Sequence, residues 1–339
     1  MPVAEYIQGV GESNAQAYGY DIREEAMNHA WRTSRIPKAV DFHGFDVYII
    51  CIATHREDNI LLPQTQGIFS IIDRISKEGK DGALVSIEST VPKGTSRKVL
   101  EILNHRMHVV HAPHRWYAQE EKEHGVNQLR VIAGVDECCL HKGLQFYSGV
   151  SAVSSNDTNN TTNSTQFDVN HYAASLVNIP VKGGLGIPMH PVSNVELAEL
   201  AKVIENADRY LKIAFAEDLY LYCVENQLNF WELRAALNTK WNVEILEPRE
   251  GIGGHCLPKD TRMFLESSQS TKSKILAAAI EVDMQYRKYR ETMSHRRLKA
   301  LDDTEKEELV QTLPKSKSSS TIASRVIASP TMKPGEHNS

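Results

Sequence analysis

Short apolar runs alternate with stretches of helical periodicity through the first half of the chain. Residues 46–54 (DVYIICIAT) are apolar on both faces, as a buried parallel strand should be. Similar runs predict further strands over 82–91, 107–113 and 130–135. Isoleucines at helical spacing predict a helix over 65–76, and a second helix is predicted over 95–103. This alternation predicts an α/β fold with a Rossmann-like, doubly wound parallel sheet.

The pattern changes to purely helical in the second half. Residues 193–226 carry apolar side chains at 197, 200, 203, 204, 207, 211, 214, 215 and 219, which predicts one long amphipathic helix. Shorter helices are predicted over 230–237 and 273–289. We therefore expect a Rossmann-like domain over 1–190, an all-helical domain over 191–295 and a charged, low-complexity tail over 296–339. A Ser/Asn/Thr-rich stretch near 151–166 is predicted to be a disordered insertion.

The N-terminal residues carry a glycine pair that we do not interpret as a phosphate-binding loop. Residues 15–21 could form a short strand ending on Asp21, but only nine residues separate Gly11 from Asp21 in the printed sequence. That is too few for the helix and strand that should follow such a loop. Residues 3–8 instead fit the end of a first helix. The first strand and its glycine loop are therefore expected to be missing.

The composition of the chain argues against two classes of binding partner. The 339-residue chain has 38 Lys and Arg against 43 Asp and Glu, for a net charge of −5, so neither nucleic acid nor an anionic membrane is the expected partner. No apolar run approaches the ~20 residues of a membrane span, and no signal peptide is evident. The five cysteines show no disulfide spacing, which favours a cytoplasmic location.

The segment 251–260 (GIGGHCLPKD) is the main candidate for chemistry. Cys256 could be a nucleophile, with His255 and Lys259 supplying positive charge that favours its thiolate. Gly253 and Gly254 would let the backbone approach a ligand closely. Asp260 could act as a base or orient water. A structural cysteine in a glycine-rich turn is the alternative.

Two polar residues on the long predicted helix add to this hypothesis. Lys202 and Asn206 are four residues apart and so share one helical face, beside the apolar stripe. A cation and an amide donor could together stabilise an oxyanion on a carbon attacked by Cys256. The alternative is that Lys202 and Asn206 simply lie on a solvated edge of the helix.

No metal site is predicted. Histidines at 105, 108, 111 and 114 recur every third residue, but the segment is predicted as a strand, where such spacing alternates between the two faces. Cys138 and Cys139 are interpreted as core residues, as are Cys51 and Cys223 in their apolar runs.

Four segments in this order resemble the UDP-glucose/GDP-mannose dehydrogenase family. GIGGHCLPKD is similar to the cysteine motif of that family, and VELAELAKVIENADRYLKIAFAEDL to its central helix. IESTVPKGT is similar to its strand-to-helix turn at the cofactor, and ILEPREGIGGHC is closest to the branch acting on UDP-N-acetyl-D-mannosamine. The resemblance covers roughly residues 15–290.

This resemblance implies an NAD-dependent oxidation of a UDP-sugar alcohol to a carboxylate. Cys256 would form a thiohemiacetal and then a thioester, Lys202 and Asn206 would hold the oxyanion, and Asp260 would assist proton transfer. Asp21 would bind the ribose hydroxyls of NAD. The remaining cofactor-binding residues would be Thr54, Thr90 and Lys259. A homodimer through helix 193–226 is also implied.

Several features depart from the family pattern. His114 stands where the family has a glutamate, although Arg115 fits the mannosamine branch. We expect the substrate-binding residues to be Arg115, His114, Gly253, Gly254 and His255. The family's third, nucleotide-binding domain is expected to be absent, because too few residues follow Ser294. A non-catalytic chain that only dimerises is therefore an alternative, and a generic NAD(P)-dependent hydroxyacid dehydrogenase is a third.

Overall fold

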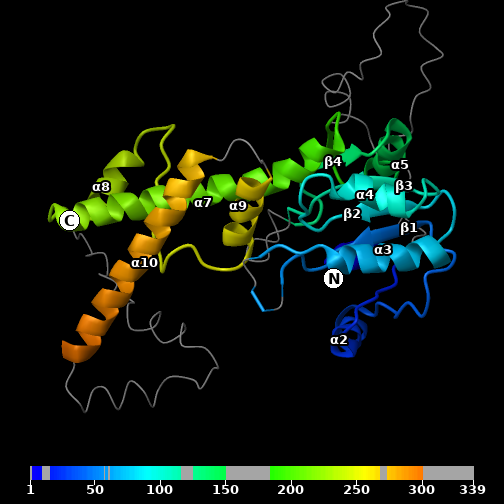
Figure 1. The fold of residues 1–339 in the computed structure, drawn as a ribbon, viewed down its shortest axis with the longest axis horizontal. Coiled ribbons are helices and arrows are strands. Elements are labelled where there is room, and N and C mark those ends of the chain that lie inside the picture. Colours follow the sequence, from blue (N-terminus) through cyan, green and yellow to red (C-terminus); the bar gives the residue numbers. More distant parts are fainter. Residues whose placement is uncertain are drawn as a thin grey trace, which may run out of the picture. The chain divides into compact units, whose positions relative to one another are not determined.

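The computed structural model describes residues 2–9, 16–56, 58–59, 62–115, 125–149, 184–267 and 273–300. The chain divides into two compact units (Figure 1). The first unit comprises the residues up to Asn206 together with the segment that begins at Lys259, and the second begins at Ala207. The division therefore falls inside the long helix, whereas the sequence analysis placed the domain boundary at residue 190.

A five-stranded sheet forms the centre of the first unit. Its strands lie in the order β1 (Val47–Ile50), β2 (Leu84–Ile87), β3 (His108–His111), β4 (Arg130–Gly134) and β5 (Met189–Pro191). The strands β1, β2 and β3 are parallel, in the register Val47 to Leu84 to His108. β4 runs antiparallel to β3, and β5 runs parallel to β4. The predicted α/β fold is confirmed, with one antiparallel pairing that the apolar pattern did not reveal.

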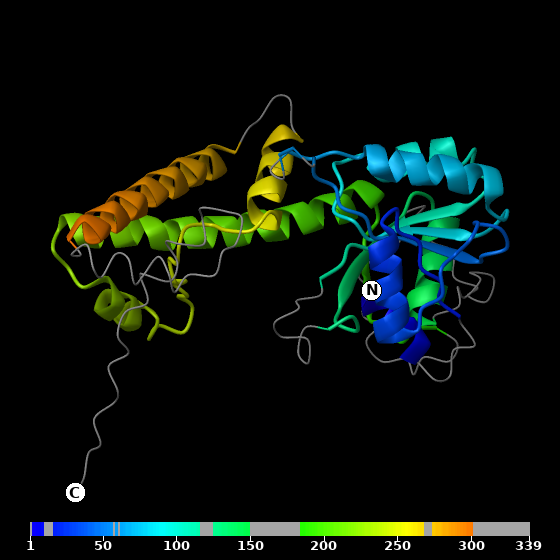
Figure 2. The same cartoon turned by 90° about the horizontal axis from the view of Figure 1, so that it is seen from below.

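Helices cover both faces of this sheet (Figure 2). On one face α3 (Gln66–Glu78) and α4 (Thr95–Ile102) share an apolar cluster with β1, β2 and Val109 of β3. On the other face α1 (Pro2–Gly9) and α5 (Glu137–Ser148) pack against a second cluster that includes Leu84 and Ile132. Because both faces are buried, the strands carry the continuous apolar runs that made them recognisable.

The N-terminal region differs in part from expectation. Residues 2–9 are helical, and Val3 and Ile7 enter the core, so the prediction of a helix over 3–8 is confirmed. The strand expected over 15–21 is wrong for the described residues, where the only pairing is a single bridge from Gly19 to Lys38. Glycine and polar residues interrupt the apolar side chains in this stretch, so it lacks the continuous apolar run of the buried strands. α2 (Glu24–Ser34) follows it.

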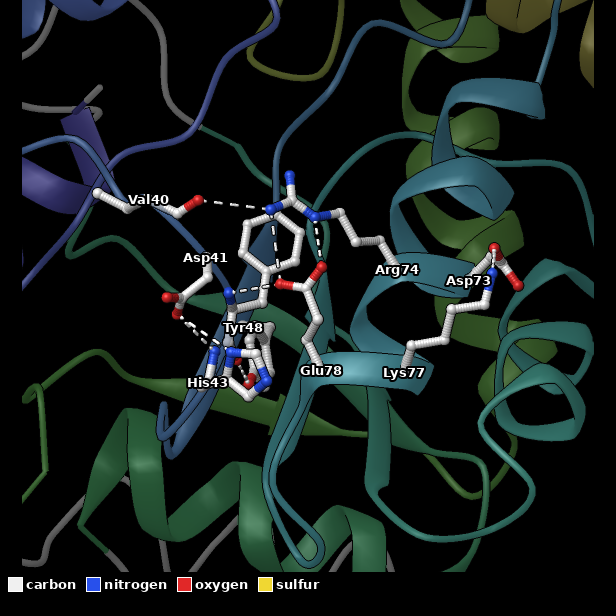
Figure 3. A network of polar contacts seen from close by, with 9 residues as sticks. Val40, Asp41, His43, Tyr48, Asp73, Arg74, Lys77 and Glu78 are labelled. Atoms are coloured by element: carbon white, nitrogen blue, oxygen red, sulfur yellow. Dashed lines mark hydrogen bonds and ion pairs between the residues drawn. The ribbon is translucent and has the colours of Figure 1, made fainter.

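A polar network fastens the segment before β1 to helix α3 (Figure 3). The Arg74 guanidinium binds the Glu78 carboxylate at 2.8 Å and lies 4.3 Å from the centroid of the Phe42 ring. Glu78 in turn accepts a hydrogen bond from the backbone N–H of Phe42 at 2.9 Å. One helix turn therefore positions the loop that leads into β1.

The second unit is helical, as predicted. The long helix α7 (Val195–Glu225) enters it at Ala207 and is followed by α8 (Phe230–Leu237). The last two helices are α9 (Cys256–Glu266), whose residues from Lys259 onward count with the first unit, and α10 (Lys274–Ala300). Within the described part of the chain, no helix has the length and apolar character to cross a membrane.

Candidate functional site

A buried polar cluster in the first unit joins residues from four parts of the chain. The Lys259 ammonium lies 2.6 Å from the Asp260 carboxylate and 3.2 Å from the hydroxyl of Thr54. The Thr54 hydroxyl donates to the carbonyl of Thr90 at 2.7 Å. The side-chain amide of Asn206 donates to Asp260. Lys259 is 3% exposed and Asp260 is 1% exposed. Five of the predicted site residues therefore meet here.

The topology explains why these residues meet. Thr54 and Thr90 follow the carboxyl ends of the parallel strands β1 and β2, which lie side by side. Ligands of open α/β sheets bind outside this edge of the sheet. The buried Lys259 and Asp260 cost desolvation energy, and their contact with each other offsets part of it.

A second group of predicted residues lies around the first turns of α7. Burial of the ring lowers the pKa of His114 to about 4, and the charges of Arg130 and Lys202 act in the same direction. Arg115 forms an ion pair with Glu205 and donates to the carbonyl of Leu129 at 2.9 Å. His114 is therefore a neutral imidazole at physiological pH, which fits a hydrogen-bonding role and not a charged one.

In the second unit, helix α10 fixes the loop that precedes Cys256. Asp283 accepts a hydrogen bond from the backbone N–H of Ile252 at 2.8 Å, and its carboxylate also binds Arg287 at 3.0 Å. Tyr286 donates to the carbonyl of Arg249 at 2.9 Å. The backbone of Gly251 has φ of +91°, a conformation that favours glycine.

Cys256 is the first residue of α9, and its side chain is exposed. Its Sγ lies 3.4 Å from Nε2 of His255, within the distance range of a thiol–imidazole hydrogen bond. The neighbouring Gly254 has φ of +74°, and no described atom lies within 4 Å of the position of a Cβ there. The thiol is therefore accessible and next to an imidazole, an arrangement that suits a nucleophile. Its expected meeting with Lys202 stays a prediction.

Asp21 does not join the Thr54 cluster. Its carboxylate accepts a hydrogen bond from the backbone N–H of Arg23 at 2.8 Å, just before α2. Among the described residues, the Thr54 hydroxyl and the Thr90 carbonyl are polar groups at the strand ends, where a dinucleotide would bind in this fold. The groups expected to contact NAD are therefore those at the carboxyl ends of the parallel strands.

The sequence analysis missed a buried charged network at the same edge of the sheet. Glu88 follows β2 and pairs with Arg130 at 2.9 Å, and both side chains are fully buried. Tyr147 donates to Glu88 at 2.6 Å. Burial and the Arg130 charge lower the pKa of His111 to about 3. The signal was present in the sequence as single charged residues in or next to apolar strands.

Another missed residue is Glu199, which connects α7 to the turn after β2. Its carboxylate accepts hydrogen bonds from the backbone N–H groups of Gly94, at 2.6 Å, and Ser96, at 2.7 Å. These N–H groups belong to the N-terminus of α4, where a carboxylate is favoured. The IESTVPKGT turn is thereby fixed to the helix that carries Lys202 and Asn206.

Comparison with known proteins identifies the family. Residues 21–150 match the model of the NAD binding domain of the UDP-glucose/GDP-mannose dehydrogenase family. Residues 196–285 match the model of the central domain of the same family. Because the two matches follow in order and together cover most of the described chain, the chain belongs to the UDP-glucose/GDP-mannose dehydrogenase family, and its first unit contains the NAD-binding domain of these oxidoreductases.

Three individual relatives show which members of the family this chain resembles. A UDP-N-acetyl-D-mannosamine dehydrogenase of Methanococcus maripaludis is 26% identical over 241 residues, which cover 70% of this chain and 48% of the relative. The Escherichia coli K12 enzyme of the same name is 30% identical over 204 residues, covering 60% and 44%. A solved UDP-D-ManNAc dehydrogenase of Pyrococcus horikoshii shares the fold, with a TM-score of 0.66 at 23% identity over 88% of this chain and 69% of that one. The chain spans about half the length of the curated relatives it matches.

Proposed function

We propose that this chain is an NAD-dependent 6-dehydrogenase of a UDP-sugar, and that the sugar is N-acetyl-D-mannosamine. The observation that carries the proposal is the buried cluster of Thr54, Thr90, Asn206, Lys259 and Asp260. It joins the strand ends of an NAD-binding fold to the helix that begins at Cys256. The choice of sugar rests on the named relatives and on Arg115.

The reaction is a four-electron oxidation of a primary alcohol. NAD, when bound, would accept one hydride per molecule, so the two oxidation steps, alcohol to aldehyde and thiohemiacetal to thioester, would use two molecules of NAD. The Cys256 thiolate adds to the aldehyde carbon to form a thiohemiacetal, whose oxidation leaves a thioester. Water then cleaves the carbon–sulfur bond, which releases the carboxylate and restores the thiol.

The other residues have supporting roles in this proposal. Lys202 and the second N–H of the Asn206 amide stabilise the oxyanion of the thiohemiacetal. Asp260, held by Lys259 and Asn206, orients Asn206 and assists proton transfer from the attacking water. The neutral His114 donates a hydrogen bond to the substrate, next to Arg115, while Gly253, Gly254 and His255 line its approach to the thiol.

The experiment is to follow NADH absorbance with UDP-N-acetyl-D-mannosamine and NAD. Cys256→Ser should abolish formation of the uronate, and Lys202→Met should lower kcat roughly 10²–10³-fold. Cys223→Ser, a buried cysteine of the second unit, is the matched control and should keep full activity. Full activity of Cys256→Ser would favour a generic hydroxyacid dehydrogenase.

The alternative from the sequence analysis, a non-catalytic chain that only dimerises, is not favoured by the two family matches but makes distinct predictions. This candidate predicts an NAD affinity no better than millimolar in a titration of the purified chain. It also predicts no NADH signal while Cys256 remains fully labelled by an alkylating reagent.

We further infer a homodimer through α7. Its side chains Leu197, Ile204, Phe215 and Tyr222 are exposed apolar groups. Their spacing of 7, 11 and 7 residues, read from the sequence numbers, puts them on one face of the helix. Burying this apolar stripe against a second copy of the same chain would be more favourable than leaving it exposed to water.

All five cysteines are free thiols, which supports a cytoplasmic location.

A further inference from the structure

Three potential metal ligands meet at one end of the sheet, outside the site described above. They are His108, the first residue of β3, and the adjacent Cys138 and Cys139 in the first turn of α5. One ring nitrogen of His108 and the two sulfur atoms all lie within 4.8 Å of one another. Cys139 is buried, His108 is half-buried and Cys138 is exposed.

The backbone brings these three residues together. The N–H of Val135 donates to the carbonyl of Val109 at 3.0 Å, which ties the end of β4 to β3. A Cβ on Gly134 would lie 2.2 Å from the backbone nitrogen of Leu140, so only glycine permits the tight turn into α5. This turn places the two thiols beside the start of β3.

Burial raises the pKa of the Cys139 thiol, and backbone N–H groups offset part of that shift. Both cysteines lie in the first turn of a helix, where backbone N–H groups and the helix dipole stabilise negative charge. Lys142, one turn further along α5, is an exposed cation near His108. Solvent screens its repulsion of a bound metal ion.

A purely structural role explains only one of the three residues. Cys139 packs in the apolar cluster beside Leu140 and Val110, as an ordinary core cysteine does. The exposed Cys138 and the half-buried His108 have no such reason to turn their ligand atoms toward that thiol.

We propose that His108, Cys138 and Cys139 bind a thiophilic divalent cation, for which zinc is the preferred occupant. Zn²⁺ binds thiolate sulfur at about 2.3 Å and imidazole nitrogen at about 2.0 Å, which requires ligand atoms roughly 3.5 Å apart. The three ligand atoms lie within 4.8 Å of one another, so they must close by at most roughly 1.3 Å. The two thiols release one proton each on binding. The fourth position of the tetrahedron faces solvent and holds water.

The test is a cobalt titration of the reduced full-length chain in a Cys256→Ser background. That substitution removes the adjacent pair of Cys256 and His255, which could also bind the metal ion. We expect one equivalent of Co²⁺ to produce a sulfur-to-cobalt charge-transfer band, and one equivalent of Zn²⁺ to bleach it. Cys138→Ser, Cys139→Ser and His108→Asn should each weaken binding at least about tenfold.

Matched controls separate ligand loss from loss of the fold. Cys51→Ser and His105→Asn change the same residue types outside the cluster and should leave the band unchanged. Cys138→Ser alters an exposed side chain, so its metal-free unfolding temperature should equal that of the parent, while added zinc should raise only the parent's unfolding temperature. Absence of the charge-transfer band, or binding that survives all three substitutions, would overturn the proposal. Neither result bears on the dehydrogenase proposal.

Discussion

At the scale of single residues, the structure shows what surrounds Asp260. The sequence suggested a base, because the residue follows a candidate nucleophile by four positions. The fold buries this carboxylate between Lys259 and Asn206. The residue type alone suggests a base. Which groups stabilise its negative charge depends on the side chains that are buried next to it.

This burial leads to a prediction for Lys259. Replacing Lys259 with Met leaves the Asp260 carboxylate buried without a cation and with only the Asn206 amide as a donor, so we expect the free energy of unfolding to fall by about 3–5 kcal/mol. Lys77→Met, which breaks the exposed pair with Asp73, should cost at most about 0.5 kcal/mol. Urea unfolding followed by circular dichroism measures both, and equal losses would contradict the role given to burial.

A second residue-scale prediction concerns pH. Burial, and next the nearby Asp283 carboxylate, raise the pKa of Glu217 to about 8. The folded chain thus keeps a proton that the unfolded chain loses near pH 4.5. Between these two values, rising pH should lower the free energy of unfolding of the second unit by up to about 1.4 kcal/mol per pH unit.

The matched variant is Glu217→Gln, which keeps the shape of the side chain and cannot titrate. Thermal unfolding from pH 5 to pH 8 should show a declining midpoint in the parent chain and a flatter profile in the variant. If the two profiles had the same slope, Glu217 would not be the group that takes up the proton.

At the scale of elements, the periodicity of apolar residues was a sound guide. The helices α3, α4, α7 and α8 and the strands β1 to β4 were all predicted, with ends shifted by a few residues. The buried strands were recognisable because both their faces need apolar side chains. The antiparallel direction of β4 could not be read in this way, because an apolar strand has the same pattern in either direction.

The loop before Cys256 gives an element-scale prediction. A Cβ on Gly251 would lie 2.9 Å from Arg287, in addition to the strain of φ +91°. Gly254 shares only the backbone strain, with φ +74° and no atom within 4 Å. Alanine at either position should destabilise by roughly 1 kcal/mol for the backbone alone. We expect Gly251→Ala to cost more, since Arg287 must also move.

Thermal unfolding of the two alanine variants ranks these costs directly. Labelling of Cys256 by an alkylating reagent gives a second readout, because Arg287 and Asp283 hold the backbone of Ile252 near that residue in sequence. Faster labelling in Gly251→Ala than in Gly254→Ala is expected. The reverse order would contradict the anchoring role of α10.

At the scale of the whole molecule, the proposed dimer gives the last prediction. Phe215→Glu and Tyr222→Glu each place a charge in the exposed apolar stripe of α7 and should convert the dimer to a monomer. Arg209→Glu introduces the same carboxylate on α7 outside the stripe and should keep the dimer. Light scattering after size-exclusion chromatography measures the mass, and a parent chain that is already monomeric would end the proposal.

The sequence by itself determined the α/β class, the order of most elements and the family. Those properties depend on local periodicity and on short motifs, both of which are written in consecutive residues. Only the tertiary structure decided that Thr54 and Asn206 reach Lys259 and Asp260, and that His108 meets two cysteines. Such meetings depend on strand order and helix packing, which bring together residues up to 205 positions apart, as Thr54 and Lys259 are.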